Sequence, residues 1–173
     1  MESKKLRLAS KLTYDSIVDG PGIRMVLWTQ GCPHHCPGCH NPQTHDAHGG
    51  FEEETSTIIR AIHDAHLQTG LTLSGGEPFD QPAALLDIVK EAKKAGLSIW
   101  AYSGYLFEEL MKDSARRILL KEIDILVDGR FMEDQKDYRL RFKGSKNQRI
   151  IDVQESLKKQ AVVISSYDES NQI

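Results

Sequence analysis

The hydrophobic and polar positions of this chain alternate between short apolar runs and longer amphipathic segments. The apolar runs predict buried strands over residues 23–29, 71–74, 97–102 and 123–127. Apolar residues at helical spacing predict helices over residues 55–69, 82–95 and 105–120. Near the end, the pattern indicates a short helix over residues 153–159 and a last strand over residues 161–165. Strands that alternate with helices imply βαβ units and a parallel sheet.

The helix expected over residues 105–120 is predicted to bury one stripe, made of Phe107, Leu110, Met111 and Ile118. The whole chain has 173 residues, well short of the roughly 250 residues of a closed eight-fold barrel. We therefore expect an α/β fold, an open partial (βα) barrel with a parallel sheet, in a single domain over residues 1–173.

Four polar motifs follow directly on predicted strands. A loop rich in Cys, Pro, Gly and His follows residue 29, and the motifs at 75–78, 103–104 and 128–130 end the next three strands. In parallel α/β proteins, ligands bind at the edge where the strands have their carboxyl ends. The sequence therefore predicts that all four loops converge on one site.

Composition narrows the class of protein. Hydrophobic residues make up 39% and charged residues 27%, as in ordinary globular domains. The formal net charge of −3 argues against binding nucleic acid through bulk charge. No apolar run approaches the roughly 20 residues that span a bilayer, and the first residues lack the apolar stretch of a secretory signal. We expect a cytoplasmic protein with neither nucleic acid nor membrane as a partner.

The three cysteines are the most specific feature of the sequence. Cys32, Cys36 and Cys39 lie within eight residues with the spacing C-x3-C-x2-C. Such a cluster does not form a disulfide framework and indicates metal or redox chemistry. Three thiolates can anchor an iron–sulfur cubane and leave one iron open to a substrate. Zinc is the competing ion, since several histidines crowd the same loop: His34, His35, His40, His45 and His48.

The cysteine spacing, followed by Gly75-Gly76-Glu77-Pro78, resembles the radical S-adenosylmethionine (SAM) superfamily. The further segments VDGPGIR (residues 18–24), DGRF (128–131) and LRFKGSKNQRIID (140–152) resemble the glycyl-radical-enzyme activating family, in the branch that acts on anaerobic ribonucleoside-triphosphate reductase. The resemblance covers nearly the whole chain and implies the partial barrel of the radical SAM type. It also implies that the three cysteines hold a [4Fe–4S] cluster whose open iron is chelated by SAM.

The resemblance further assigns cofactor-binding roles. Glycines at 75 and 76 let a ligand approach the backbone, and Glu77 is expected to contact the ammonium group of SAM. Asp128 and Arg130 are expected to bind SAM or to order the site near it. Many radical SAM proteins have an aromatic residue immediately before the third cysteine, where this chain has Gly38. The adenine contact is therefore expected from the backbone around residues 38–40, which includes Cys39 and His40.

The activity that the resemblance implies is the installation of a glycyl radical on anaerobic ribonucleoside-triphosphate reductase, with a reduced flavodoxin-like protein as electron donor. Three alternatives stay open. They are an activase of another glycyl-radical enzyme, of the pyruvate formate-lyase type; a small radical SAM enzyme acting on a small molecule; and a zinc-binding module, which would leave the GGEP motif unexplained.

Two further expectations concern the glycine turn and a basic segment. A bulky residue at Gly76 should impair SAM binding while leaving the cluster intact. From Arg139 to Arg149 the chain carries five basic residues and no acidic one, and we interpret this segment as a docking surface for the partner protein, in which Arg141 and Lys143 set the association rate through their charge.

Overall fold

The fold is described from a computed structural model, which covers residues 2–169. Its strands are β1 (Lys5–Leu8), β2 (Thr13–Ser16), β3 (Arg24–Thr29), β4 (Phe51–Glu54), β5 (Gly70–Gly75), β6 (Ser98–Ser103), β7 (Ile125–Asp128) and β8 (Arg149–Asp152). Its helices are α1 (Thr55–Asp64), α2 (Pro82–Lys94), α3 (Phe107–Lys112), α4 (Ser114–Leu120), α5 (Val153–Lys159) and α6 (Ser166–Glu169). Single 3-10 turns are η1 (Pro42–Thr44), η2 (Pro78–Asp80) and η3 (Glu133–Gln135).

The strands form one eight-stranded sheet in the order β4-β1-β3-β5-β6-β7-β8, with β2 also paired to β3. The central strands β3, β5, β6 and β7 are parallel. The outer strands β1, β2, β4 and β8 pair antiparallel with their neighbours. The sheet does not close on itself, so the predicted open α/β fold with a parallel sheet is confirmed.

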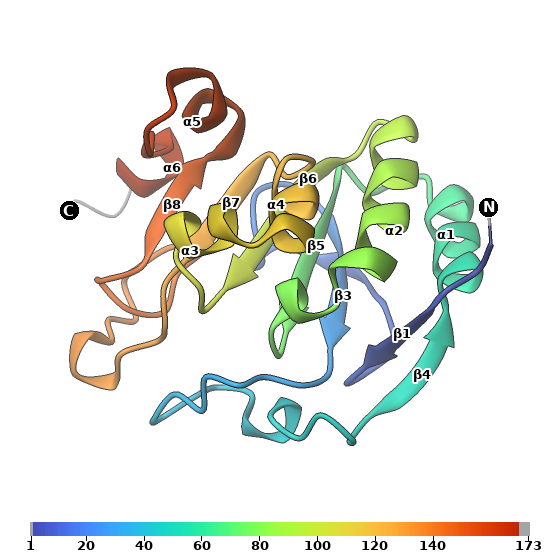
Figure 1. Ribbon diagram of the computed structural model, residues 1–173, viewed down its shortest axis with the longest axis horizontal. Helices are drawn as coiled ribbons and strands as arrows, with labels where there is room; N and C mark the ends of the chain where they lie inside the picture. The colour runs from blue at the N-terminus through green and yellow to red at the C-terminus, as the bar shows by residue number, and fades with distance from the viewer. Residues whose placement is uncertain (1, 170–173) are drawn as a thin grey trace.

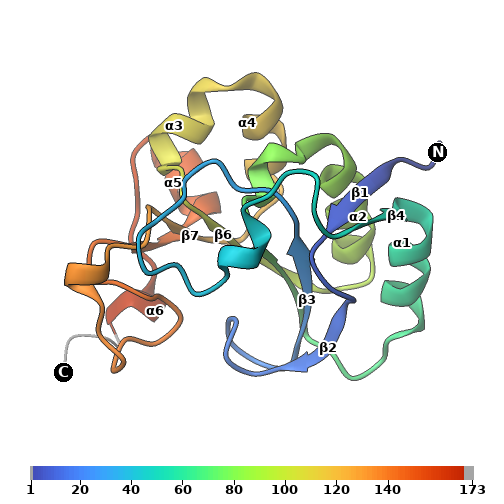
Figure 2. The ribbon, with the colours of Figure 1, turned by 90° about the horizontal axis from the view of Figure 1, so that it is seen from below.

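Helices α1, α2, α3 and α4 cover one face of the sheet (Figure 1). The large core cluster lies between them and the strands, where side chains such as Leu27, Leu73, Ile88 and Leu126 are fully buried. Figure 2 shows the segment between β3 and β4 crossing in front of the sheet edge, with the segment between β7 and β8 beside it. The parallel strands thus place the loops after their carboxyl ends at one edge.

The helix predicted over residues 105–120 is broken in two. Asp113 adopts an extended backbone and caps α4, since its side chain accepts a hydrogen bond from the backbone N–H of Arg116 at 2.9 Å. The break shifts the face that α4 presents. Phe107 and Leu110 are buried as expected and Met111 packs against the core, but Ile118 is 51% exposed, so its predicted burial is wrong.

Two further boundaries differ from the sequence prediction. Helix α1 ends at Asp64, because Ala65 is extended, and not at residue 69. The strand predicted over residues 161–165 is wrong: within it, only Ile164 forms a bridge, to Ile151. Strand β8, which the pattern did not predict, takes the place beside β7. Within residues 2–169, no helix is long and apolar enough to cross a membrane.

Candidate functional site

A cavity of about 450 Å³ opens at the carboxyl ends of the parallel strands. Its walls come from the loop after β3, the glycine turn after β5, the end of β6 and the segment after β7. The predicted convergence of four loops on one site is therefore confirmed. The volume lies within the roughly 300–1,000 Å³ of small-molecule pockets.

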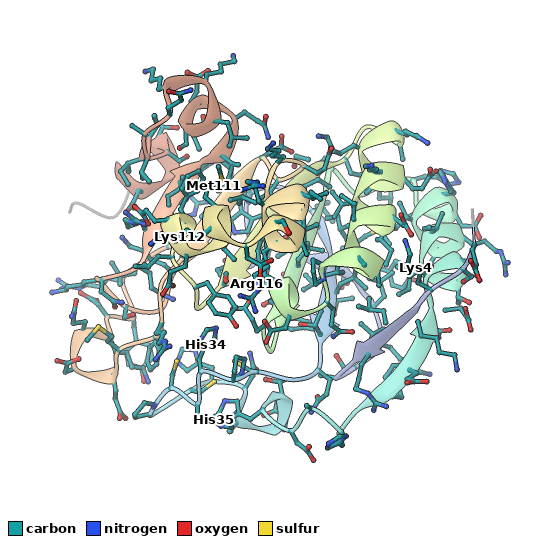
Figure 3. The ribbon with its side chains drawn as sticks, viewed as in Figure 1. Lys4, His34, His35, Met111, Lys112 and Arg116 are labelled. Carbon is teal, nitrogen blue, oxygen red and sulfur yellow. The ribbon has the colours of Figure 1, made fainter. Side chains whose placement is uncertain are left out.

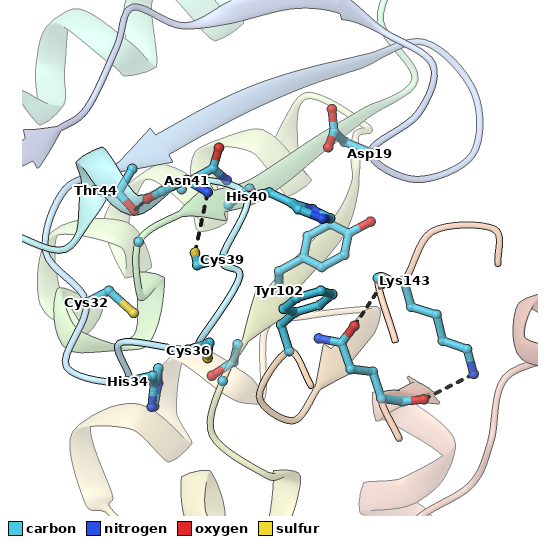
Figure 4. A pocket seen from close by; sticks show the side chains of 18 of the residues that line it. Asp19, Cys32, His34, Cys36, Cys39, His40, Asn41, Thr44, Tyr102 and Lys143 are labelled. Carbon is cyan, nitrogen blue, oxygen red and sulfur yellow. Dashed lines mark hydrogen bonds between the residues drawn. The ribbon is translucent and has the colours of Figure 1, made fainter. Parts of the chain in front are cut away.

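The three cysteines line this cavity, and their sulfur atoms face a common space (Figure 4). All three side chains are half-buried free thiols. Burial raises the pKa of Cys32 to about 11, against the opposing effect of a hydrogen bond from the backbone N–H of His34. The backbone N–H of Asn41 donates to Cys39 Sγ at 3.4 Å. Hydrogen bonds of this kind to sulfur are among the groups that tune iron–sulfur potentials.

Backbone hydrogen bonds hold the cysteine loop in its shape. The N–H of Gly31 donates to the Thr44 carbonyl at 2.7 Å, and that of Cys39 donates to the Cys36 carbonyl at 3.1 Å. Gly38 has a φ of +74°, in the left-handed region, and an added Cβ would meet the Glu133 carboxylate at 2.8–3.1 Å. The left-handed conformation therefore favours glycine where many radical SAM proteins have an aromatic residue, whereas the exposed Glu133 side chain is free to move aside.

The glycine turn after β5 packs against the backbone of the cysteine loop. Both Gly75 and Gly76 line the cavity. A Cβ on Gly76 would lie 2.3 Å from the carbonyl oxygen of Gly31, and that oxygen accepts a hydrogen bond from the N–H of Glu77 at 2.8 Å. The close approach that these glycines permit is thus partly to the cysteine loop itself, which alters the expectation for a bulky residue at Gly76.

The Glu77 side chain is fully buried and is not among the residues that line the cavity. Its carboxylate accepts hydrogen bonds from Ser103 Oγ and from the backbone N–H groups of Gly104 and Phe79, at 2.9–3.0 Å. His34 Nε2 lies 2.8 Å from the same carboxylate. In this arrangement Glu77 joins loops behind the cavity, and its contact with the SAM ammonium stays a prediction.

Asp128 and Arg130 also lie outside the cavity lining. The buried carboxylate of Asp128 accepts hydrogen bonds from the N–H of Phe107 and from Arg149 Nε and Nη2, at 2.6–3.0 Å. Arg130 is exposed. Their neighbours Gly129 and Phe131 do line the cavity, so a role in binding SAM stays a prediction for Asp128 and Arg130.

The antiparallel pairing of β7 with β8 explains why the DGRF and NQRI motifs occur together. Asn147 Nδ2 donates to the Arg130 carbonyl at 2.8 Å, and Gln148 Nε2 donates to the Gly129 carbonyl at 2.9 Å. Arg149 completes the pairing through Asp128. The side chains of the second motif thus hold the backbone of the first against the cavity.

Comparison with known proteins is consistent with this geometry. The model of a 4Fe-4S single cluster domain matches residues 18–151. The anaerobic ribonucleoside-triphosphate reductase-activating protein of Vibrio cholerae is 39% identical over 141 residues, which cover 76% of this chain and 89% of that protein. The protein of the same name from Escherichia coli K12 is 38% identical, covering 76% and 90%, and that from phage T4 is 33% identical over 152 residues, covering 80% and 93%. The chain belongs to this family of activating proteins.

A solved structure, that of QueE from Escherichia coli, overlaps 58% of this chain and 52% of its own, with a TM-score of 0.46 and 16% identity. Membership in the activating-protein family confirms the resemblance read from the motifs. It also decides between the two candidate metals in favour of an iron–sulfur cluster, because the matching domain is a 4Fe-4S domain.

The cysteines of this activating protein suit such a cluster. A cubane attaches each thiolate to a different iron, so its sulfur ligands must lie around one common space. The three half-buried thiols meet this condition, because all of them line the same cavity.

Sequence reasoning missed several residues of the cavity. Trp28 and Tyr102 line it from the strands, and burial raises the pKa of the Tyr102 hydroxyl. Phe131 also lines it, with its ring centroid 5.0 Å from that of His40. The period-two pattern of β3 and β6 could have placed Trp28 and Tyr102 opposite the core face, but it could not show that this face is a cavity wall.

The VDGPGIR segment of the activating protein is a turn held by its own arginine. The buried Arg24 donates hydrogen bonds to the Pro21 carbonyl and to Thr72 Oγ1 at 3.0 and 2.8 Å, and Thr72 Oγ1 donates to the Asp19 carbonyl at 2.7 Å. Burial lowers the pKa of Arg24 to about 10. Because this turn is fixed, Asp19 stays at the cavity wall.

Most charges of the basic segment over residues 139–149 have partners within the chain, and its role as a docking surface stays a prediction. Lys143 is 8% exposed and lies 2.6 Å from Asp168 in an ion pair. Arg149 pairs with Asp128 and with Glu108, at 2.6 and 2.8 Å. Arg139 and Lys146 both pair with Asp137, just outside the segment, at 2.7 and 3.9 Å. Most of this positive charge is therefore matched within the chain.

Proposed function

We propose that this activating protein cleaves SAM reductively at a [4Fe–4S] cluster held by Cys32, Cys36 and Cys39, and thereby generates a glycyl radical on anaerobic ribonucleoside-triphosphate reductase. One observation carries the proposal: the three thiols face the same cavity as the glycine turn, at the edge where all four loops meet. The name of the relatives in its family identifies the reductase as the target.

Cys32, Cys36 and Cys39 would hold the cluster, which would supply the one electron that splits SAM into methionine and a 5′-deoxyadenosyl radical. That radical would take a hydrogen atom from a glycine Cα of the reductase and become 5′-deoxyadenosine. The protein contributes binding, orientation and shielding. Three cysteines leave one iron without a protein ligand, and SAM is the natural occupant of that position.

The residues around the cavity divide into two groups in this proposal. Gly75 and Gly76 present main-chain polar groups to the ligand, and the rings of His40 and Phe131 offer flat surfaces for the adenine. Glu77 and Asp128 lie outside the cavity lining, and their carboxylates hold the cavity loops in place through hydrogen bonds. Arg130, which is exposed, contributes through its carbonyl contact with Asn147.

A primary carbon radical takes hydrogen from most C–H and S–H groups that it meets, so the cavity must keep it away from all such groups except the target glycine. Trp28 and Tyr102 form part of its wall, and Phe142 adds an apolar side chain. We propose a reduced flavodoxin-like protein as the donor of the electron, which reaches the cluster through the half-buried cysteine loop.

An anaerobic mixture of the reduced protein, SAM and the reductase tests this function. We expect an electron paramagnetic resonance (EPR) doublet of a glycyl radical on the reductase, together with methionine and 5′-deoxyadenosine. The Cys36→Ala variant serves as the matched control and should give neither product. A radical that forms on pyruvate formate-lyase, and not on the reductase, would favour the alternative activase.

A further inference from the structure

The segment between the first two cysteines contains two adjacent histidines with opposite environments. The side chain of His34 is 3% exposed, whereas that of His35 is exposed. Figure 3 shows His34 extending from the cysteine loop toward the helix that carries Arg116, with His35 on the outer side of the loop. The sequence makes both histidines candidate metal ligands, but the ring of His34 contacts another group.

That partner is the carboxylate of Glu77. His34 Nε2 lies 2.8 Å from Glu77 Oε1, in a pair whose members are 3% and 0% exposed. With Nε2 protonated, the ring donates to the carboxylate. The other donors to this carboxylate are the N–H of Phe79 in η2, just after the glycine turn, and two groups at the end of β6, Ser103 Oγ and the N–H of Gly104. His34 is therefore the side chain through which the cysteine loop joins this buried junction.

The ring of His34 occupies a space shaped for it. Tyr105 meets it edge-on, with ring centroids 4.5 Å apart and planes at 75°. The guanidinium of Arg116 lies 4.2 Å from the centroid of the Tyr105 ring, and Tyr105 Oη donates to Asp80 at 2.9 Å. A Cβ on Gly104 would lie 2.4 Å from the His34 ring. Packing thus fixes the ring in the orientation that reaches Glu77.

The position of His34 in the chain also connects it to the cysteines. It lies two residues after Cys32 and two residues before Cys36. One residue therefore links the stretch between two proposed cluster ligands to the carboxylate that follows the glycine turn. A ligand that contacts both the cluster and the glycine turn depends on their relative position.

We propose that His34 is a positioning residue of the activating protein: its ring–carboxylate contact with Glu77 holds the cysteine loop and the glycine turn in the geometry that SAM binding requires. The inference rests on the proposed function. A hydrogen bond to a buried carboxylate is among the stronger ones in proteins. Its loss should weaken SAM binding about tenfold or more.

The experiment compares three variants after anaerobic reconstitution and reduction. His34→Phe keeps an aromatic ring for Tyr105 but has no donor for Glu77. His34→Gln places an amide N–H where the ring Nε2 was. His48→Phe makes the same chemical change at an exposed histidine of the same loop. Each protein is titrated with SAM, and the change in the EPR spectrum of the reduced cluster gives the half-saturating concentration.

We expect iron content close to that of the unaltered protein in all three variants. His34→Phe should need at least about tenfold more SAM, His34→Gln should stay within about threefold, and His48→Phe should match the unaltered protein. Gly104→Ala is a second test, because its Cβ would displace the His34 ring without removing it. This variant should also need at least about tenfold more SAM, so the inference can be tested even if His34→Phe fails to fold.

Two results would overturn the inference. One is SAM binding by His34→Phe equal to that of the unaltered protein, and the other is a His34→Gln variant as weak as His34→Phe, since packing and not the hydrogen bond would then be responsible. The failure of the proposed function looks different: the unaltered protein itself would show no spectral response to SAM.

Discussion

Replacing Gly76 by alanine should disturb the cysteine loop as well as SAM binding. The added Cβ would lie 2.3 Å from the carbonyl oxygen of Gly31, whereas real Cβ contacts essentially never fall below 3.0 Å. The two backbones must therefore separate by at least 0.7 Å, the difference between these values. The carbonyl concerned accepts the N–H of Glu77 at 2.8 Å, so the same movement stretches this hydrogen bond.

The expected cost follows from these two contacts. Overpacking costs roughly 1–3 kcal/mol, and an unsatisfied buried polar group about 1–3 kcal/mol. Because the backbone can relax in part, the two costs do not add in full. We therefore expect Gly76→Ala to lose about 2–4 kcal/mol of unfolding free energy. A displacement close to 1 Å at a reactive site can lower the rate about 100-fold.

The assay measures iron content and visible absorption after anaerobic reconstitution, then the rate at which a chelator removes the iron. We expect faster iron loss and weaker SAM binding together. Gly96→Ala is the matched control: its Cβ would meet nothing within 4 Å, although its φ of +85° adds strain of its own of about 1–2 kcal/mol. A Gly76→Ala protein that binds iron and SAM like the unaltered protein would refute the reasoning.

Three further predictions concern the thiols and the basic segment. Cys36→Ala should lose stable iron and abolish SAM cleavage, measured as 5′-deoxyadenosine, and undiminished cleavage would contradict the ligand assignment. Lys143→Glu would place a second carboxylate beside Asp168 at a side chain only 8% exposed; we expect it to cost about 3–5 kcal/mol by urea unfolding, with a much smaller loss for the exposed Arg141→Glu. In the metal-free protein, burial raises the pKa of Cys32 from 9.0 to about 11, so the folded state holds this proton longer than the unfolded state does. Its contribution to stability is then complete below pH 9 and lost as the pH rises toward 11; alkylation of Cys32, followed by mass spectrometry, should have its midpoint near pH 11 and not near pH 9.

The parts of the fold that sequence reasoning predicted well have strong local signals. Helix α2 carries Pro82 in its first turn and ends just before Gly96, and the structure places it at Pro82–Lys94. Strand β3 contains the apolar run Met25–Trp28. In β5, Leu71 and Leu73 alternate with polar residues and belong to the core cluster. The break between α3 and α4 also has a local signal, because the Asp113-Ser114 pair is typical of a helix start. The apolar residues on both sides keep helical spacing across this pair, so the pattern predicts one continuous helix.

What could not be predicted depends on contacts between residues far apart in the chain. Nothing in the sequence shows that His34 and Ser103 surround the Glu77 carboxylate. The partner of Asp128, Arg149, reaches it only because β8 pairs antiparallel with β7. The composition of the basic segment does not show that Lys143 is paired, since Asp168 lies outside the segment.

The distribution of the site along the chain bears on the order in which it forms during folding. All three thiols lie within eight consecutive residues, so bringing them together closes only a short loop. The cavity walls instead need pairings such as β3 with β5 and β7 with β8, which join distant parts of the chain and form more slowly. A nascent or refolding chain would thus present metal-binding thiols before the walls that shield them. Iron supplied to the folded protein should therefore give a more uniform cluster than iron present during refolding.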